Sequence, residues 1–128
     1  MKEDIELAKK ARFNAHSPYG NFQVGACLRC KNGKVYTGCN VENHGIQGIC
    51  AERTAFVKAI SEGEREFVSI TVVGAPTGED INEYCTPCGY CRQFMSEFVD
   101  KDFKIYITNG KEVKTYTIEE LLPNSFKF

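Results

Sequence analysis

The stretch FQVGACLRCKNGKVYTGCNV, residues 22–41, predicts a β-hairpin. Two strand-like runs, residues 22–30 and 34–41, lie on either side of Asn32 and Gly33. An Asn-Gly pair between two such runs is the strongest short-range signal for a tight hairpin turn. We therefore expect two adjacent antiparallel strands, to which the flanking segments add.

Helices are predicted on both sides of this hairpin. Residues 3–15 carry apolar side chains at helical spacing, and the segment 17–21, with its proline, glycine and asparagine, ends that helix. A second helix is expected from Cys50 to Ile60, with Gly63 placed to stop it.

The second half of the chain continues the mixture of helices and strands. In order, we expect a buried strand at 67–74, a polar loop at 75–82, a helix after Pro87, a second hairpin from strands 104–108 and 112–117, and a short helix ending at 121–123. This order predicts an α/β fold with one central sheet and helices on its faces. We expect residues 1–128 to form a single domain.

Composition excludes several classes of protein. The hydrophobic content of 42% and the charged content of 26% are typical of a soluble globular protein. The net charge of −1, without a basic run, argues against binding to a nucleic acid polymer. No apolar run is long enough to cross a membrane, and the charged start Met1-Lys2-Glu3-Asp4 is unlike a signal peptide. With an odd count of 7 cysteines, this predicts a cytoplasmic protein with metal-bound and buried free thiols.

Two short segments carry the chemistry. Cys50 opens one predicted helix, while Cys88 and Cys91 open another and share one face of it. The N-terminus of a helix favours the thiolate, which is the form that binds zinc. Three protein ligands leave the fourth position of a tetrahedral zinc open for water. The sequence therefore predicts a catalytic zinc site with one Zn²⁺ per chain.

Glu52 is the expected catalytic residue. It lies two positions after Cys50, beside the metal but off the face of the ligands, which suits a group that carries protons. Three cysteines and a glutamate that is not a ligand make up the inventory for hydrolytic deamination at zinc. Three thiolates leave the zinc site with a net negative charge, so we expect Arg53 and Arg92 to donate hydrogen bonds to sulfur.

The remaining cysteines and histidines leave alternatives open. Cys85, three positions before Cys88, could close a structural four-cysteine zinc site, although Pro87 disfavours this by forcing an extended conformation on the residue before it. His16 is expected on the surface, and His44, in the loop before Cys50, could contact a ligand. Buried free thiols are expected at Cys27, Cys30 and Cys39.

Five motifs occur along the chain in the order SPYGNFQVGA (17–26), GCNVEN (38–43), CAERTA (50–55), PCGYCRQ (87–93) and LLPNSF (121–126). Each zinc segment alone is moderately specific, whereas the five motifs in this order are highly specific. On these motifs the chain resembles the small homotetrameric cytidine deaminase family over nearly its whole length.

The resemblance implies a function and an assembly. It implies deamination of cytidine and deoxycytidine in pyrimidine salvage, with an α/β/α sandwich around a mixed five-stranded sheet and a homotetramer whose sites lie at subunit interfaces. It also implies roles for individual residues: Cys50, Cys88 and Cys91 as zinc ligands, Glu52 as proton shuttle, Asn40 and Glu42 on the ribose hydroxyls, Phe22 beside the pyrimidine, Ala51 as a further substrate contact, and Phe126 in an adjacent subunit's site.

The loop 43–49 departs from the family pattern. The family is usually about one residue longer here and carries an aromatic residue on the 5′ side of the sugar, which this chain lacks. A deaminase with an altered substrate, such as one similar to blasticidin S deaminase, is therefore an alternative. A non-catalytic four-cysteine module is another, and a polynucleotide editor is disfavoured by the charge.

Overall fold

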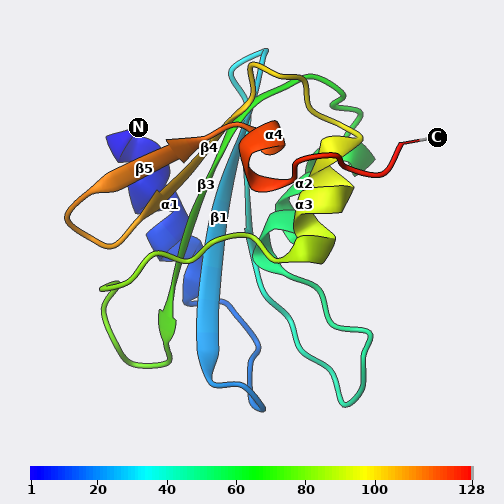
Figure 1. Ribbon diagram of the computed structural model, residues 1–128. Helices are drawn as coiled ribbons and strands as arrows, with labels where there is room; N and C mark the ends of the chain where they lie inside the picture. The colour runs from blue at the N-terminus through cyan, green and yellow to red at the C-terminus, as the bar shows by residue number, and fades with distance from the viewer. Residues whose placement is uncertain (128) are drawn as a thin grey trace.

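Within residues 1–127, which the computed structural model describes, the chain forms four helices and five strands (Figure 1). Their kind and order agree with the sequence predictions, and the single domain stays a prediction. In chain order they are α1 (Lys2–Arg12), β1 (Phe22–Cys30), β2 (Val35–Cys39), α2 (Ala51–Ser61), β3 (Phe67–Pro76), α3 (Gly89–Ser96), β4 (Lys104–Thr108), β5 (Val113–Tyr116) and α4 (Ile118–Leu121).

The end of α1 is the clearest difference from the predicted boundaries. The helix stops at Arg12 instead of residue 15. The N–H groups of Asn14 and Ala15 donate to carbonyls three residues back, and the His16 N–H donates to the Asn40 carbonyl at 3.1 Å. The last turn therefore tightens and leaves the helix, because His16 pairs with the segment that follows β2.

The five strands form one mixed sheet in the order β2-β1-β3-β4-β5. β1 is antiparallel to β2 and β3, β3 is parallel to β4, and β4 is antiparallel to β5. A parallel pair needs a long crossover, and the segment that contains α3 supplies it. The turn between β1 and β2 is the predicted one: Gly33 takes a positive φ of 90°, and Cys30 N–H donates to the Lys34 carbonyl at 2.9 Å.

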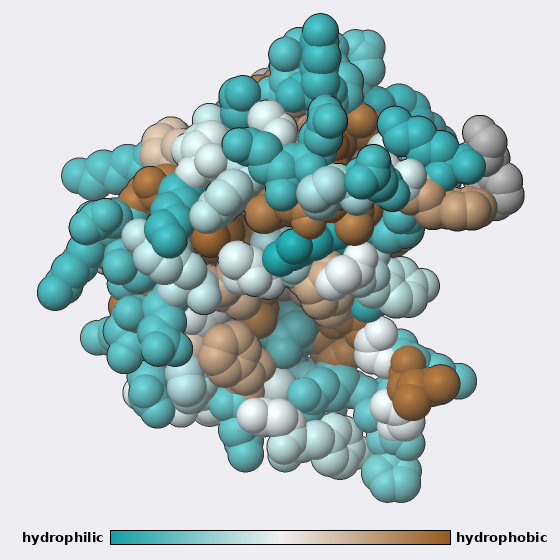
Figure 2. All heavy atoms as spheres, in the orientation of Figure 1, coloured by the Kyte–Doolittle hydropathy of each residue, from teal (hydrophilic) through white to brown (hydrophobic). Residues whose placement is uncertain are grey.

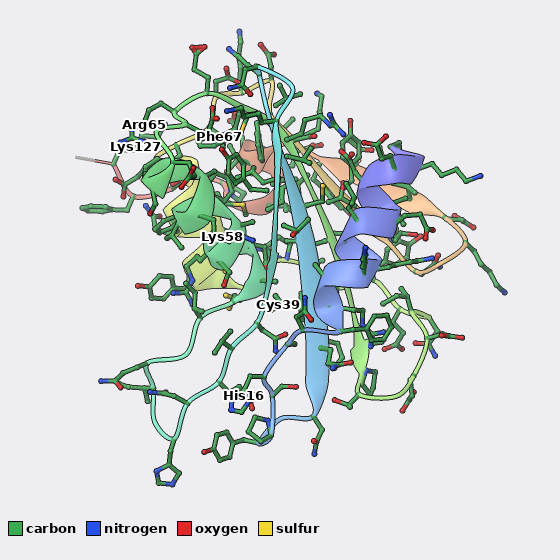
Figure 3. All side chains as sticks on the ribbon, turned by 180° about the vertical axis from the view of Figure 1, so that it is seen from behind. His16, Cys39, Lys58, Arg65, Phe67 and Lys127 are labelled. Atoms are coloured by element: carbon green, nitrogen blue, oxygen red, sulfur yellow. The ribbon has the colours of Figure 1, made fainter. Side chains whose placement is uncertain are left out.

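Helices cover both faces of this sheet, which confirms the expected three-layer sandwich. Seen from behind, α1 lies on one face and α2 and α3 lie on the other (Figure 3). Two glycines let the helices approach. A Cβ on Gly25 would lie 1.9 Å from the Ala8 carbonyl oxygen, and one on Gly38 would lie 2.5 Å from that of Ala51. The start of α2 is thereby pressed against β2.

The larger core lies between the sheet and helices α2 and α3. Phe56 of α2 is fully buried, with ring centroids 5.0 Å from Phe67, 6.3 Å from Phe94 and 6.1 Å from Phe103. Burying one such ring contributes about 1.5–3 kcal/mol. This cluster fixes α2 relative to α3, and so places their N-termini side by side.

The three cysteines of the first hairpin are free thiols. Cys27 and Cys30 are buried, as expected, whereas Cys39, also expected to be buried, is only partly buried beside α2 (Figure 3). Burial raises the pKa of Cys27 to about 11 and raises the pKa values of Cys30 and Cys39. These thiols therefore stay protonated and behave as small apolar side chains. In residues 1–127, no helix has both the length and the apolar character needed to cross a membrane.

Candidate metal centre and active site

Cysteines occupy the N-cap positions of two of the predicted helices. Cys50 is the N-cap of α2 and Cys88 is the N-cap of α3, both with extended backbone angles. The Cys88 Sγ also accepts a hydrogen bond from the backbone N–H of Cys91 at 3.5 Å. Unpaired N–H groups and the positive end of the helix dipole meet at this point. The local fold thus stabilises negative charge on sulfur.

The three expected sulfurs are brought together. Cys50 Sγ lies 3.6 Å from Cys88 Sγ, which lies 3.5 Å from Cys91 Sγ, and all three atoms are within 4.8 Å of one another. A tetrahedral zinc with bonds of about 2.3 Å would place its sulfur ligands about 3.8 Å apart. The donor set and its spacing therefore fit a zinc ion with three protein ligands.

Cys85 lies outside this group, so the structure gives no support to a four-cysteine site. Its side chain packs on the sheet instead, where a Cβ on Gly74 would lie 2.7 Å from the Cys85 Sγ. Burial, reinforced by the negative charge of Glu52, raises the pKa of the Cys85 thiol to about 12.

Charge within the sulfur group is unevenly shared. Interaction with the Cys91 thiol lowers the pKa of Cys50, with further help from Arg53 and Cys88 and against the effect of burial. The same interaction, together with burial, raises the pKa of Cys91. Of these two thiols, Cys50 therefore gives up its proton more readily.

The two arginines behave differently. Arg53 Nη2 lies 3.6 Å from Cys50 Sγ, as expected. Arg92 was expected to donate to sulfur, and the structure corrects this: its Nε donates to the Pro87 carbonyl at 2.7 Å and its Nη1 to the Leu121 carbonyl at 2.8 Å. One carbonyl lies just before α3 and the other at the end of α4, where neither has a partner within a helix. The long Arg92 side chain supplies the missing hydrogen-bond donors. Arg92 therefore ties the start of α3 to the end of α4.

Glu52 lies in the first turn of α2 and is only 3% exposed. Burial raises its pKa from 4.5 to about 7, and the negative charge on Cys50 acts in the same direction. A carboxyl group whose pKa lies near neutrality is suited to take up and release protons. Glu52 thus stands beside the three sulfurs without belonging to the metal-binding group.

Asn40 and Glu42 already hold the surrounding backbone. Asn40 Oδ1 accepts from Val24 N–H and its Nδ2 donates to the Phe22 carbonyl, each at 2.8 Å. Glu42 Oε1 accepts from Tyr19 N–H at 2.9 Å. Asn40 therefore fixes the start of β1, and Glu42 fixes the turn before it. The sequence did not reveal these bonds, because their partners are 16–23 positions away.

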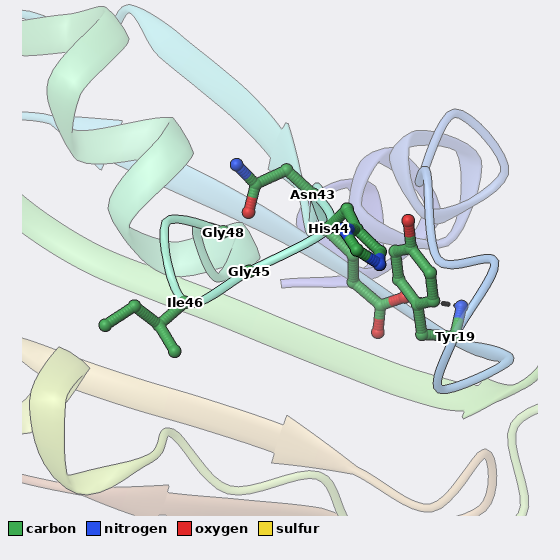
Figure 4. Close-up of a pocket in the computed structure, with 7 residues that line it drawn as sticks. Tyr19, Asn43, His44, Gly45, Ile46 and Gly48 are labelled. Carbon is green, nitrogen blue, oxygen red and sulfur yellow. Dashed lines mark hydrogen bonds between the residues drawn. The ribbon is translucent and has the colours of Figure 1, made fainter.

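A hollow of about 550 Å³ opens next to Glu42 (Figure 4). Figure 2 shows that this side of the molecule is hollowed beside the loop that follows β2. None of the three clustered cysteines lines it, and neither does Glu52. The ring centroids of Tyr19 and His44 lie 6.0 Å apart, and the two planes are tilted by 50°. The lining residues are Tyr19, Glu42, Asn43, His44, Gly45, Ile46 and Gly48.

Tyr19 is the residue here that sequence reasoning missed, although it lies within the motif at 17–26. His44 is exposed and lies outside the metal-binding group, so its contact with a ligand stays a prediction. His16 is exposed on the surface, as expected (Figure 3).

Three further residues expected at the substrate lie at the edges of the site. Phe22 opens β1, half exposed, with its ring next to Gly74. Ala51 is buried as the first residue of α2. The side-chain amide of Gln93 forms hydrogen bonds with the backbone N–H and carbonyl of Phe126, which is 63% exposed. The reach of Phe126 into another subunit stays a prediction.

Known proteins match this architecture. The model of the cytidine and deoxycytidylate deaminase zinc-binding region matches residues 1–107. The chain belongs to this family. It is 45% identical over 125 residues to a cytidine deaminase from Halalkalibacterium halodurans, which covers 95% of this chain and 90% of the relative. The structure of a cytidine deaminase from Burkholderia pseudomallei superposes with a TM-score of 0.88 at 42% identity and covers 98% of both chains.

Another relative is named for a different substrate. A blasticidin-S deaminase from Bacillus cereus is 34% identical over 128 residues, which covers 95% of this chain and 91% of that protein. The resemblance drawn from the five motifs is thus confirmed, together with the α/β fold, the hydrolase class and zinc as cofactor.

Proposed function

We propose that this protein is a zinc-dependent hydrolase that converts cytidine and deoxycytidine to uridine and deoxyuridine and releases ammonia. The observation that carries this proposal is the group of three sulfurs, with separations of 3.5 and 3.6 Å, beside the buried Glu52. The proposal places the enzyme in cytoplasmic pyrimidine salvage, as a homotetramer with sites at subunit interfaces.

Each group near the sulfurs has a role in this reaction. Cys50, Cys88 and Cys91 hold the zinc ion, which supplies, when bound, a water molecule of lowered pKa. Glu52 takes the proton that this water gives up and passes it to a ring nitrogen of the base. Oxygen from water forms the new bond to the amidine-like carbon. Glu52 then takes the proton of the new hydroxyl group and delivers it to the amine, and the carbon–nitrogen bond breaks to release ammonia.

The substrate contacts follow from the free hydrogen-bonding capacity of the polar residues. Asn40 keeps one amide N–H beyond its bond to Phe22, and the Glu42 carboxylate keeps acceptor sites beyond its backbone partners. These groups suit the ribose hydroxyls. Phe22 packs beside the pyrimidine, with Ala51 as a further contact at the start of α2, and Phe126 of an adjacent subunit completes the site.

A second candidate is a deaminase with the same mechanism and another substrate. The hollow beside residues 43–49 favours it, because the exposed loop supplies an imidazole and a fully exposed Ile46 where the family pattern has an aromatic residue. The blasticidin-S deaminase relative supports the same idea.

The test is ammonia release by the purified, zinc-loaded protein with cytidine, deoxycytidine and blasticidin S. We expect rapid release with the two nucleosides. Release from blasticidin S alone would favour the second candidate. Release from none of them by a folded protein with one zinc per chain would contradict the first candidate and favour a deaminase that acts on a different aminated substrate.

A further inference from the structure

Arg53 and Tyr90 meet across the two helix N-termini that carry the cysteines. Arg53 lies in the first turn of α2 and Tyr90 in the first turn of α3. The Arg53 Cζ stands 3.9 Å from the centre of the Tyr90 ring. At this distance the cation is attracted by the electron-rich face of the ring.

The Arg53 guanidinium is held between this ring and sulfur. Its Nη2 lies 3.6 Å from Cys50 Sγ. Its Nε is buried and has no hydrogen-bond partner among the described residues. Among residues 1–127, no carboxylate forms a salt bridge with Arg53. The ring of Tyr90 thus lies over one face of this cation.

The exposure of Tyr90 also calls for an explanation. The residue is 67% exposed, although it lies between two of the clustered cysteines. A tyrosine that serves only to fill the core would be buried. One face of the Tyr90 ring instead lies against Arg53. This contact accounts for the exposed position of the ring.

We propose that Tyr90 is a positioning residue, whose ring holds the Arg53 guanidinium against the metal-binding sulfurs. A positive charge shielded from water acts more strongly on nearby thiolates than one that moves in solvent. Hydrogen bonds from Arg53 lower the energy of the sulfur lone pairs, which protects them from protons and electrophiles and leaves a bound metal more electron-poor. The inference rests on the proposed ligand set Cys50, Cys88 and Cys91, and it does not depend on the substrate.

The test uses the full-length protein loaded with Co²⁺, whose sulfur-to-metal charge-transfer absorption reports the energy of the sulfur lone pairs. Replacing Tyr90→Leu removes the aromatic face and lets Arg53 move away from sulfur. We expect the absorption to move to longer wavelength and the transfer of metal to a chromophoric chelator to become about three- to tenfold faster, in line with the strength of cation–π contacts. Tyr90→Phe keeps the ring and should restore both readouts to those of the unaltered protein.

A matched control exists on the other face of the sheet. Arg12 Cζ stands 4.9 Å from the centre of the Phe13 ring, and Phe13 is 63% exposed. Phe13→Leu removes a comparable cation–π contact away from the cysteines and should leave the absorption and the transfer rate unchanged. In an Arg53→Ala background, Tyr90→Leu should add no further change.

Several outcomes would overturn the inference. These are an unchanged absorption and transfer rate in Tyr90→Leu, a Tyr90→Phe variant that behaves like Tyr90→Leu, and an undiminished effect of Tyr90→Leu when Arg53 is absent. If Tyr90→Leu does not fold, Tyr90→Gln serves for the same comparison. An unaltered protein that binds no Co²⁺ would contradict the ligand set itself, which distinguishes the failure of the proposed function from the failure of this inference.

Discussion

The cysteine cluster and the hollow beside Glu42 are built in different ways. The cluster lies at two helix N-termini that a buried phenylalanine core holds together, so its chemistry is fixed by rigid elements. The hollow is lined by residues of two loops. The Glu42 carboxylate and the paired rings of Tyr19 and His44 join these loops. We therefore propose that the reaction depends on rigid elements, whereas part of the choice of substrate depends on loops. Loops vary more easily than the elements that they connect.

The largest effect is expected from removing a zinc ligand. Cys88→Ala deletes one of three sulfurs and the cap of α3. We expect zinc to fall well below one per chain, and activity to fall by more than the roughly 10- to 100-fold typical of changes around a metal site. Zinc content and ammonia release measure this. Cys39→Ala, outside the cluster, should keep its zinc, and a fully zinc-loaded Cys88→Ala would contradict the ligand set.

The next effect separates chemistry from metal binding. Glu52→Gln keeps the shape of the side chain but cannot carry a proton, so we expect a loss of about 10²- to 10⁴-fold in kcat. The variant should stay folded with one zinc per chain. Deamination at the original rate would rule out Glu52 as the proton shuttle.

The same substitution should stabilise the zinc-free protein in a pH-dependent way. The pKa of Glu52 is raised to about 7 in the folded state, so the folded state binds more protons than the unfolded state between about pH 4.5 and 7. Glu52 therefore reduces the stability of the unaltered protein as the pH rises through this window, and the variant lacks this contribution. We expect the gain in unfolding free energy from Glu52→Gln to grow from near zero at pH 4 to about 3 kcal/mol at pH 8. Urea unfolding at both pH values measures this, and an advantage independent of pH would contradict it.

Glu42 tests the link between the two regions. Glu42→Ala removes the acceptor for the backbone N–H groups of Tyr19 and Gly20. We expect a loss of about 1 kcal/mol in unfolding free energy and a rise in KM for cytidine, with zinc content unchanged. Urea unfolding and steady-state kinetics measure these effects, with the exposed Glu83→Ala as a control. Unchanged stability and KM would mean that Glu42 neither holds the turn nor contacts the sugar.

The smallest effect is expected at the rim of the hollow. His44 is exposed, and changes at exposed side chains are usually worth no more than about 0.5 kcal/mol in stability. We expect His44→Ala to keep its stability and its zinc, and to change the ratio of kcat/KM between cytidine and blasticidin S. An unchanged ratio would remove His44 from substrate selection.

The contrast between the two regions also sets how much could be predicted from sequence. The hairpin at Asn32 and Gly33 and the two cysteine-capped helices have local signals, so their prediction from sequence agreed with the structure. The direction of Arg92 could not be predicted, because its long side chain reaches a carbonyl 29 positions away. The bonds of Asn40 and Glu42 depend in the same way on how β1 and its preceding turn fold back.

The most direct test of the central claim is a zinc titration. Zinc is removed with a chelator and returned in steps, while bound metal and ammonia release from cytidine are measured together. Activity is predicted to vanish in the zinc-free protein and to rise in proportion to bound zinc until one ion per chain is reached. Activity that persists without zinc, or full zinc binding without activity on any aminated substrate, would contradict the assignment of the cysteine cluster as the catalytic centre.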